Sequence, residues 1–249
     1  MGDVQASTGS GQVALSPGRA QLGFAEPRQR MVLALDFDDS VVAMRWALRL
    51  RPWFGVAKVG MELFSASGPS VVTELLEAGF KVFADFKLAD IPNTNRRAAR
   101  VIGALGASYL TVHSFAPASL RAGVEGFAEG AENAGFAPPG VLAVTVLTSE
   151  PDAAEAVLSE RAQVASQAGC AGVVCAAADL GVVRSSAPGL LTAVPGVRLA
   201  GAVGDDQARV ATPAEAVRAG ADLLVVGRAV TAHPDPETVA AAILSELST

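Results

Sequence analysis

Short apolar runs alternate with amphipathic stretches along most of the chain, starting at residue 31. Glycine, proline or polar residues bound each run, which is typical of buried β-strands, and the amphipathic stretches have a helical period. The pattern predicts strands at residues 31–36, 56–60, 80–86, 109–113, 141–147, 172–175, 191–194 and 223–226. Helices are expected at residues 40–50, 68–78, 93–105, 116–127, 152–168 and 236–247, with Asp39 or Ser40 capping the first.

The predicted helices tend to end in glycine shortly before the next strand, at Gly79, Gly106, Gly169 and Gly220. Glycine in this position is typical of a helix C-terminus that turns into a strand. About eight strand–helix units in roughly 220 residues indicate an α/β protein with a (β/α)8, or TIM, barrel. An open, doubly wound sheet is the alternative fold. A dinucleotide fold has little support, because no G-x-G-x-x-G motif follows the first strand.

Residues 1–30 differ from the rest of the chain. They are rich in glycine, serine, glutamine and alanine, with no sustained periodicity and no apolar segment behind a basic one. We expect a flexible tail without a role in the chemistry, and not a secretory signal. Residues 31–249 are then a single catalytic barrel domain.

Composition excludes several classes of partner. Of 249 residues, 51% are hydrophobic, which is enough for a large core, and the net charge of −6 gives no electrostatic footprint for nucleic acid. No apolar run approaches the roughly 20 residues of a membrane helix. Cys170 and Cys175 lack the C-x2-C spacing of a metal pair, so we interpret them as buried reduced thiols and expect a cytoplasmic protein.

The segment from residue 82 to residue 94 concentrates charge at the end of an apolar strand. Asp85 and Lys87 would point to the same side, because side chains in a strand alternate with a period of two. Asp90 follows on the next turn. Burying such charges is costly unless they pair or serve a site, so we interpret the segment as the chemical centre.

Other predicted strands also end in polar residues, and in a (β/α)8 barrel these ends meet at one mouth. Any single strand-end charge could simply be solvated, but several converging on one rim indicate a site. Lys58 is either a lysine reaching to solvent or the partner of Asp85 or Asp36. His113 is as easily structural as catalytic. The strand-end residues are Asp36, Lys58, Asp85, Lys87, His113, Thr148, Arg198 and Arg228.

The late chain has features of a phosphate site. A glycine-containing loop at residues 201–207 follows the seventh strand, and Gly227 and Arg228 end the eighth. Barrels often bind phosphate between these two loops, where glycine lets the backbone approach and arginine supplies a charged fork. Gln207 could reach the phosphate from the loop. An ordinary glycine turn with a surface arginine is the alternative.

Residues 85–94, Asp-Phe-Lys-Leu-Ala-Asp-Ile-Pro-Asn-Thr, resemble the D-x-K-x-x-D-I-P-N-T signature of the orotidine 5′-phosphate decarboxylase family. The similarity runs in order through residues 33–36, 58–64, 146–149, 195–198, 209–213 and 225–228, and so covers residues 31–247. Position 89 is alanine where many members have histidine. That position is not catalytic in the family.

The resemblance implies a homodimeric barrel that converts orotidine 5′-phosphate to UMP and CO2 without a metal or other cofactor. It implies that Lys87 is the proton donor in an array with Lys58, Asp85 and Asp90. Asp90 would reach across the dimer, with Ile91 and Thr94 also at the partner's site. The remaining implied contacts are Asp36 and Lys58 to the ribose, Thr148 and Ser149 near the pyrimidine, and Arg198, Gln207, Gly227 and Arg228 on the phosphate side.

Two other functions remain open from the sequence. A Mg2+-dependent sugar-phosphate decarboxylase or aldolase of the same barrel superfamily shares the shorter D-x-K-x-x-D motif, although the Ile-Pro-Asn-Thr continuation disfavours it. A non-catalytic nucleotide-binding barrel is the third possibility.

Overall fold

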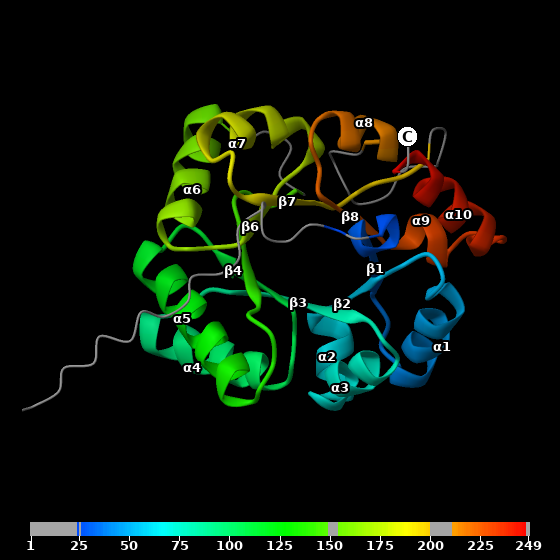
Figure 1. The fold of residues 1–249 in the computed structure, drawn as a ribbon, viewed down its shortest axis with the longest axis horizontal. Coiled ribbons are helices and arrows are strands. Elements are labelled where there is room, and N and C mark those ends of the chain that lie inside the picture. Colours follow the sequence, from blue (N-terminus) through cyan, green and yellow to red (C-terminus); the bar gives the residue numbers. More distant parts are fainter. Residues whose placement is uncertain (1–23, 25, 149–153, 200–210, 248–249) are drawn as a thin grey trace, which may run out of the picture.

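The computed structural model describes residue 24 and residues 26–148, 154–199 and 211–247. Eight parallel strands form a closed barrel in sequence order, with helices in a ring around them (Figure 1). The strands are β1 Met31–Leu35, β2 Val56–Gly60, β3 Lys81–Leu88, β4 Tyr109–His113, β5 Gly140–Val144, β6 Gly172–Val174, β7 Leu191–Val194 and β8 Leu223–Val226.

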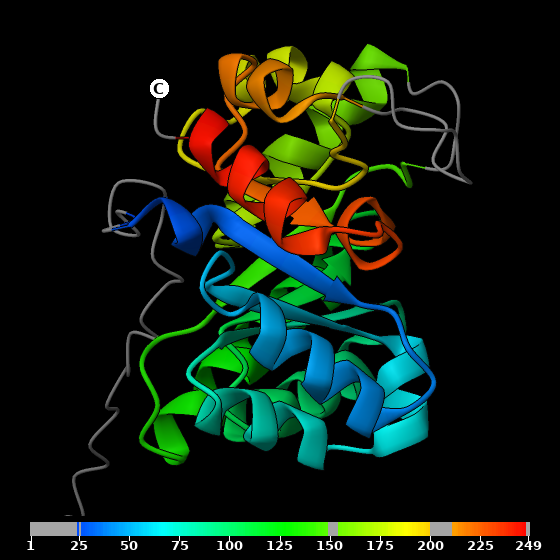
Figure 2. The same ribbon diagram turned by 90° about the vertical axis from the view of Figure 1, so that its right-hand side faces the viewer.

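The main helices are α1 Ser40–Leu50, α2 Met61–Ser67, α3 Ser70–Glu77, α4 Pro92–Ala104, α5 Pro117–Asn133, α6 Glu155–Gln167, α7 Leu180–Ser186, α8 Pro213–Arg218, α9 Arg228–Thr231 and α10 Pro236–Glu246. Figure 2 shows α1 and α10 on the two sides of β1. No helix in the described ranges has the length and apolar character needed to cross a bilayer.

Pairing between the first and last strands distinguishes this barrel from an open sheet. Met31, Val32 and Leu33 of β1 lie opposite Leu224, Val225 and Val226 of β8. The predicted (β/α)8 fold is therefore confirmed, and the doubly wound alternative is wrong. Closure brings the carboxyl ends of all eight strands to one mouth.

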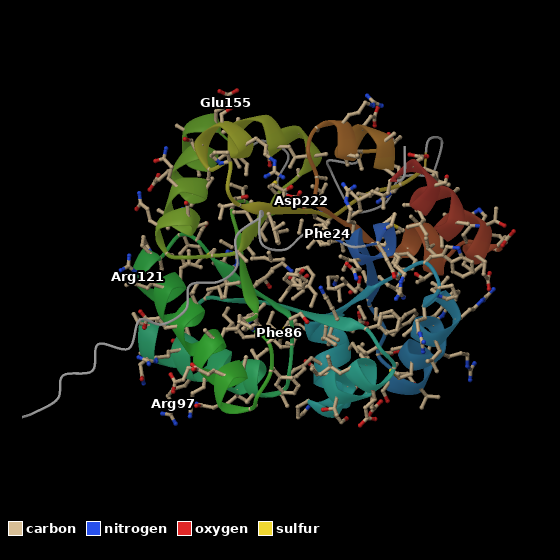
Figure 3. All side chains as sticks on the ribbon, in the orientation of Figure 1. Phe24, Phe86, Arg97, Arg121, Glu155 and Asp222 are labelled. Atoms are coloured by element: carbon tan, nitrogen blue, oxygen red, sulfur yellow. The ribbon has the colours of Figure 1, made fainter. Side chains whose placement is uncertain are left out.

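The apolar core has two layers. One lies between strands and helices and includes Phe54, Leu75 and Phe127; the other fills the barrel interior and includes Phe83 and Tyr109. The strands carry apolar residues on both faces because both faces are covered. Charged side chains such as Arg97, Arg121 and Glu155 project from the outer helices, whereas Asp222 lies within the ring (Figure 3).

Several ends of helices were predicted correctly from local residue preferences. Asp39 caps α1, its carboxylate accepting hydrogen bonds from the backbone N–H of Val41 (2.7 Å) and Val42 (3.0 Å). The four predicted helix-end glycines all adopt left-handed backbone, with φ between 80° at Gly169 and 100° at Gly220. The two cysteines are buried and unbridged, as expected.

Other predicted boundaries were wrong. The helix expected at residues 68–78 begins later, at α3, and the separate helix α2 precedes it, because Gly68 (φ 69°) and Pro69 interrupt the helix between them. Helix α5 extends to Asn133, beyond the expected end at residue 127, and β5 ends at Val144. Helices α7 and α8 were not expected.

The short 3-10 helix η1, Pro27–Arg30, lies within the stretch expected to be a tail. Arg30 donates hydrogen bonds to the carbonyl oxygens of Ala221 (2.8 Å) and Asp222 (3.1 Å), just before β8. Phe24 packs against the barrel interior. The rest of that stretch lies outside the described residues.

Candidate active site

A cavity of about 320 Å³ opens at the carboxyl ends of the strands. Its floor is apolar, formed by Phe83, Val144, Val174 and Val225, and its walls carry most of the polar residues that the sequence singled out. Those wall residues are Asp36, Lys58, Asp85, Lys87, Thr148, Arg198, Gly227 and Arg228.

Four of the wall residues form a continuous chain of alternating charge. Lys58 Nζ lies 2.9 Å from Asp36 Oδ1 and 3.6 Å from Asp85 Oδ2. Lys87 Nζ lies 2.9 Å from Asp85 Oδ1. Lys58 is only 8% exposed, so it does not reach to solvent. The sequence predicted Asp85 or Asp36 as its partner, and in the structure Lys58 contacts both.

The charges support one another electrostatically. Burial lowers the pKa of Lys58, but the carboxylates of Asp85 and Asp36 outweigh it and hold that pKa above its usual value. Burial likewise raises the pKa of Asp85, and the ammonium groups of Lys58 and Lys87 outweigh it, so this pKa lies below its usual value. Lys58 and Asp85 therefore both stay ionised at neutral pH.

Lys87 reaches the cavity from an irregular part of β3. Its φ of 48° is the only left-handed value found at a non-glycine residue in the described ranges. The register with β4 shifts here, since Ala84 lies opposite Leu110 but Leu88 lies opposite Val112. A bulge next to an active site commonly redirects a side chain, and here it carries the outermost ammonium group of the array.

The far side of the cavity has the composition of an anion site. A side chain at Gly227 would meet Ala34 Cβ at 3.3 Å and Asp36 Oδ2 at 3.8 Å, so this backbone lies close against β1. Arg198 follows β7 and Arg228 begins α9, both on the cavity wall. Ser149 and Gln207, expected at the pyrimidine and the phosphate, lie outside the described residues.

Asp90, Ile91 and Thr94 do not line the cavity. All three are exposed at the start of α4, and Ile91 is 65% exposed although it is apolar. The carboxylate of Asp90 accepts a hydrogen bond from the backbone N–H of Ile91 (2.6 Å). The structure thus places these residues next to Lys87 in the chain but turned away from its cavity.

His113, at the end of β4, is half-buried and does not line the cavity. Its ring lies 5.0 Å from that of Phe115. Burial, Lys87 and Arg161 together lower its pKa, so the imidazole is neutral at neutral pH. These contacts suit a packed residue beside the site.

Sequence reasoning missed two parts of the site. The apolar floor was not recognisable, because Phe83, Val144 and Val174 look like any core residues of a strand. Thr111 was also missed: its hydroxyl donates to Asp85 Oδ1 (3.0 Å) and accepts from the Lys87 backbone N–H (2.9 Å). The available signal was a polar residue in the middle of an otherwise apolar strand.

In the described part of the chain, no three His, Cys, Asp or Glu side chains gather as they would to hold a metal ion. A closed eight-stranded barrel with alternating lysines and aspartates at its carboxyl mouth has the form of a (β/α)8-barrel enzyme.

The family model for the orotidine 5′-phosphate decarboxylase / HUMPS family matches residues 29–243. The chain belongs to this family. It is 46% identical over 234 residues to an orotidine 5′-phosphate decarboxylase of Anaeromyxobacter dehalogenans, covering 89% of this chain and all of that one. It is 42% identical to the orotidine 5′-phosphate decarboxylase of Methylorubrum populi, covering 90% of this chain and 97% of that one.

Solved structures agree with this placement. The orotidine 5′-phosphate decarboxylase of Lactobacillus acidophilus superposes with a TM-score of 0.77 at 30% identity, covering 89% of this chain and 100% of that chain. The enzyme of Pyrococcus horikoshii OT3 gives a TM-score of 0.71 at 29% identity, covering 88% and 99%.

Proposed function

We propose that Lys87 donates a proton to C6 of the pyrimidine in the conversion of orotidine 5′-phosphate to UMP and CO2. The chain is a carboxy-lyase of this kind, the last enzyme of UMP biosynthesis, since it matches the family over residues 29–243 and its relatives of that name over most of its length. The observation that carries the assignment of Lys87 is its ammonium group, held on the cavity wall by Asp85 at 2.9 Å.

Loss of CO2 leaves an electron pair on C6 in the plane of the ring, where no conjugated system can accept it. A protein without an electron sink must stabilise this charge electrostatically and then protonate it. An ammonium group can do both, first as a cation and then as an acid. Asp85 aims the Lys87 ammonium group with its Oδ1 atom, and Lys58 contacts the other carboxylate oxygen of Asp85.

Asp85 has a second role in this proposal. Its carboxylate would lie near the carboxylate that leaves, and two unit charges 4 Å apart repel by about 4 kcal/mol at an effective dielectric constant of 20. Release of CO2 removes this repulsion. Asp36 and Lys58 would hold the ribose hydroxyls, and Thr148 and Ser149 would lie near the pyrimidine.

The phosphate would be held far from C6, by Gly227 and Arg228, with Gln207 and Arg198 on the same side. Phosphate and guanidinium form short, charge-assisted hydrogen bonds. Binding energy gained at this remote group can be used to hold the reacting end of the substrate in place.

The active form is proposed to be a homodimer in which Asp90, Ile91 and Thr94 complete the partner's cavity. Ile91 is apolar and 65% exposed in the single subunit, as a side chain that a partner subunit covers would be, and this supports the proposal. Each stretch from Asp85 to Thr94 would then serve two sites, with Lys87 in one and Asp90 in the other.

Replacing Lys87 by alanine tests the assigned role. Lys87→Ala should bind UMP and remain folded but lose at least about a thousandfold in turnover, because both the charge and the proton are removed. The fall in orotidylate absorbance gives the rate, and calorimetry gives UMP affinity. Near-normal turnover would remove Lys87 from the mechanism.

The same assay in EDTA separates the proposal from its rivals. A Mg2+-dependent sugar-phosphate enzyme, which the broader family description leaves room for, would lose its activity in the chelator. A nucleotide-binding barrel would bind UMP without consuming orotidylate. We expect full turnover of orotidylate in EDTA.

Mixing two inactive variants tests the shared site. In a mixed dimer of Lys87→Ala and Asp90→Ala subunits, one of the two cavities regains both residues. Random reassortment should restore about a quarter of the wild-type activity in a symmetric dimer. No recovery, with mixed dimers shown to form by mass spectrometry, would place Asp90 in its own subunit's site or outside any site.

A further inference from the structure

Thr111 lies between Asp85 and Lys87 of β3 and contacts both. It is fully buried in the middle of β4, and its hydroxyl makes two hydrogen bonds to the segment opposite. It donates to Asp85 Oδ1 at 3.0 Å and accepts from the backbone N–H of Lys87 at 2.9 Å. One hydroxyl group thus connects the carboxylate of one residue to the backbone of the other.

The geometry of the bulge explains why a hydroxyl is needed there. Ala84 of β3 pairs with Leu110 of β4, and the next pair is Leu88 with Val112. Residues 85–87 of β3 therefore lie opposite a single residue of β4, Thr111. A regular backbone ladder cannot satisfy every N–H in such a bulge, and a buried N–H without a partner is costly. The Thr111 hydroxyl takes the place of the missing carbonyl for Lys87.

We propose that Thr111 is a positioning residue of the decarboxylase: it holds the left-handed backbone of Lys87 and the carboxylate of Asp85 in one fixed arrangement. The inference rests on the proposed role of Lys87. Asp85 Oδ1 accepts from both the Thr111 hydroxyl and the Lys87 ammonium group, so the bond from Thr111 fixes the oxygen toward which Lys87 points. Thr111 acts through these two residues and is not itself a proton donor to the substrate.

The proposal predicts a kinetic effect without loss of the fold. Thr111→Val keeps the shape of the side chain and removes the hydroxyl, so kcat should fall about ten- to a hundredfold, the range expected for a misplaced catalytic group. The KM for orotidylate and the affinity for UMP should change little, since the phosphate and ribose contacts are untouched. Thr111→Ser restores the hydroxyl and should recover most of kcat.

The pH profile gives a readout that a purely structural role would not move. Burial raises the pKa of Asp85, while Lys58, Lys87 and the hydrogen bond from Thr111 lower it. Removing that bond raises the pKa of Asp85, so the acid limb of kcat should shift to higher pH in Thr111→Val and return in Thr111→Ser. The other titratable groups near Asp85, Asp36 beside Lys58 and His113 beside Lys87, are unchanged in both variants.

Thr192→Val is the matched control. Thr192 is also a fully buried strand threonine, but its hydroxyl donates to the carbonyl oxygen of Gly220 (3.0 Å), at the opposite end of the barrel from the cavity. This variant should lower the melting temperature and leave kcat and its pH profile unchanged. If Thr111→Val does not fold, Thr111→Ala provides the same comparison with Thr111→Ser.

Two results would overturn the proposal: a wild-type kcat and pH profile in Thr111→Val, or an equal loss in Thr111→Ser and Thr111→Val. Lys87→Ala is assayed together with the Thr111 variants, so that a failure of the Thr111 proposal can be told from a failure of the proposed function. An active Lys87→Ala contradicts the mechanism itself, whereas an inactive Lys87→Ala beside a fully active Thr111→Val contradicts only the role of Thr111.

Discussion

Lys58 is a buried ammonium group held between two carboxylates, and this arrangement has consequences for stability as well as for chemistry. Lys58→Met preserves much of the side-chain volume but leaves Asp85 buried beside one cation instead of two. Breaking a buried ion pair from one side costs about 3–5 kcal/mol. In urea unfolding at pH 7, the free energy of unfolding should fall by an amount near the lower end of this range, because Asp36 is partly exposed. Turnover should fall as well.

The loss of unfolding free energy in Lys58→Met should depend on pH in a defined direction. The folded-state pKa of Asp85 lies below the reference value of 3.8, so its charge stabilises the fold above that pH and ceases to do so as the pH falls through the lowered value. The difference between wild type and Lys58→Met should therefore be full at pH 6–7 and shrink below about pH 4. Lys81→Met, at the exposed start of β3, is the control and should show neither effect. A constant difference down to pH 3 would contradict the assigned charge pairing.

For these individual residues, the sequence predicted which charges lie together but not which backbone and hydrogen bonds position them. Lys58 could be assigned to Asp36 or Asp85 because its apolar neighbours made a solvent-exposed lysine improbable. Asp85 and Lys87 were expected to share a side from simple alternation, and they do, but by way of a bulge. The left-handed backbone of Lys87 has no local sequence signal, and the polar Thr111 in an apolar strand does not reveal its partners, because both depend on the register between β3 and β4.

Helices α4 and α5 pack closely against each other, and glycine allows this close approach. A side chain at Gly130 would overlap the carbonyl oxygen of Arg100, and one at Gly126 would overlap that of Arg96. Arg96 also pairs with Glu129 across the contact at 3.0 Å. The backbones of the two helices are therefore in direct contact, and α4 begins directly after Asp90 and Ile91.

Gly130→Ala tests this contact. The added methyl group must push the two backbones apart, and overpacking of this kind costs about 1–3 kcal/mol. Gly181→Ala in α7 is the matched control, because nothing lies within 4 Å of a side chain there. Alanine is the better helix former, so this control should be neutral or stabilising by up to about 1 kcal/mol. Thermal unfolding of both variants gives the comparison, and equal stability would show that α4 and α5 can separate freely.

Helix ends were predictable from the sequence where a single residue sets them, and not where packing between helices does. The ends marked by Gly79 and Gly106 follow from the backbone preference of a single residue, and they were predicted correctly. The end of α5 was placed six residues too early, at 127 instead of 133, because glycine and alanine give little apolar periodicity. Close packing on α4, a tertiary effect, holds that last part of α5 in place.

For the whole molecule, the barrel was predicted from the number and rhythm of its strand–helix units, although the strand pairing that closes it could not be read directly. That closure lies in the pairing of β1 with β8, about 190 residues apart, for which no local pattern exists. Arg30 reinforces the same seam from the opposite end to the cavity, through its bonds to the Ala221 and Asp222 carbonyl groups.

Arg30→Ala should therefore destabilise the closed barrel. Loss of two hydrogen bonds from a charged donor is expected to cost about 1.5–3 kcal/mol, which corresponds to a fall of several degrees in melting temperature. Arg28→Ala removes only an exposed pair with Glu26 and should change the melting temperature little. Deletion of residues 2–22, which keeps Phe24, should leave both stability and turnover unchanged. Equal effects of Arg30→Ala and Arg28→Ala would deny Arg30 any role in closing the barrel.

The positive φ of Lys87 sets stability against activity at one position. Left-handed backbone costs a residue with a side chain about 1–2 kcal/mol of free energy, whereas glycine adopts it without this cost. Selection for stability alone would therefore favour glycine at position 87, and only selection for turnover would keep lysine there. In a library randomised at this position and sorted separately for thermal resistance and for growth without pyrimidines, the two sorts should recover different residues.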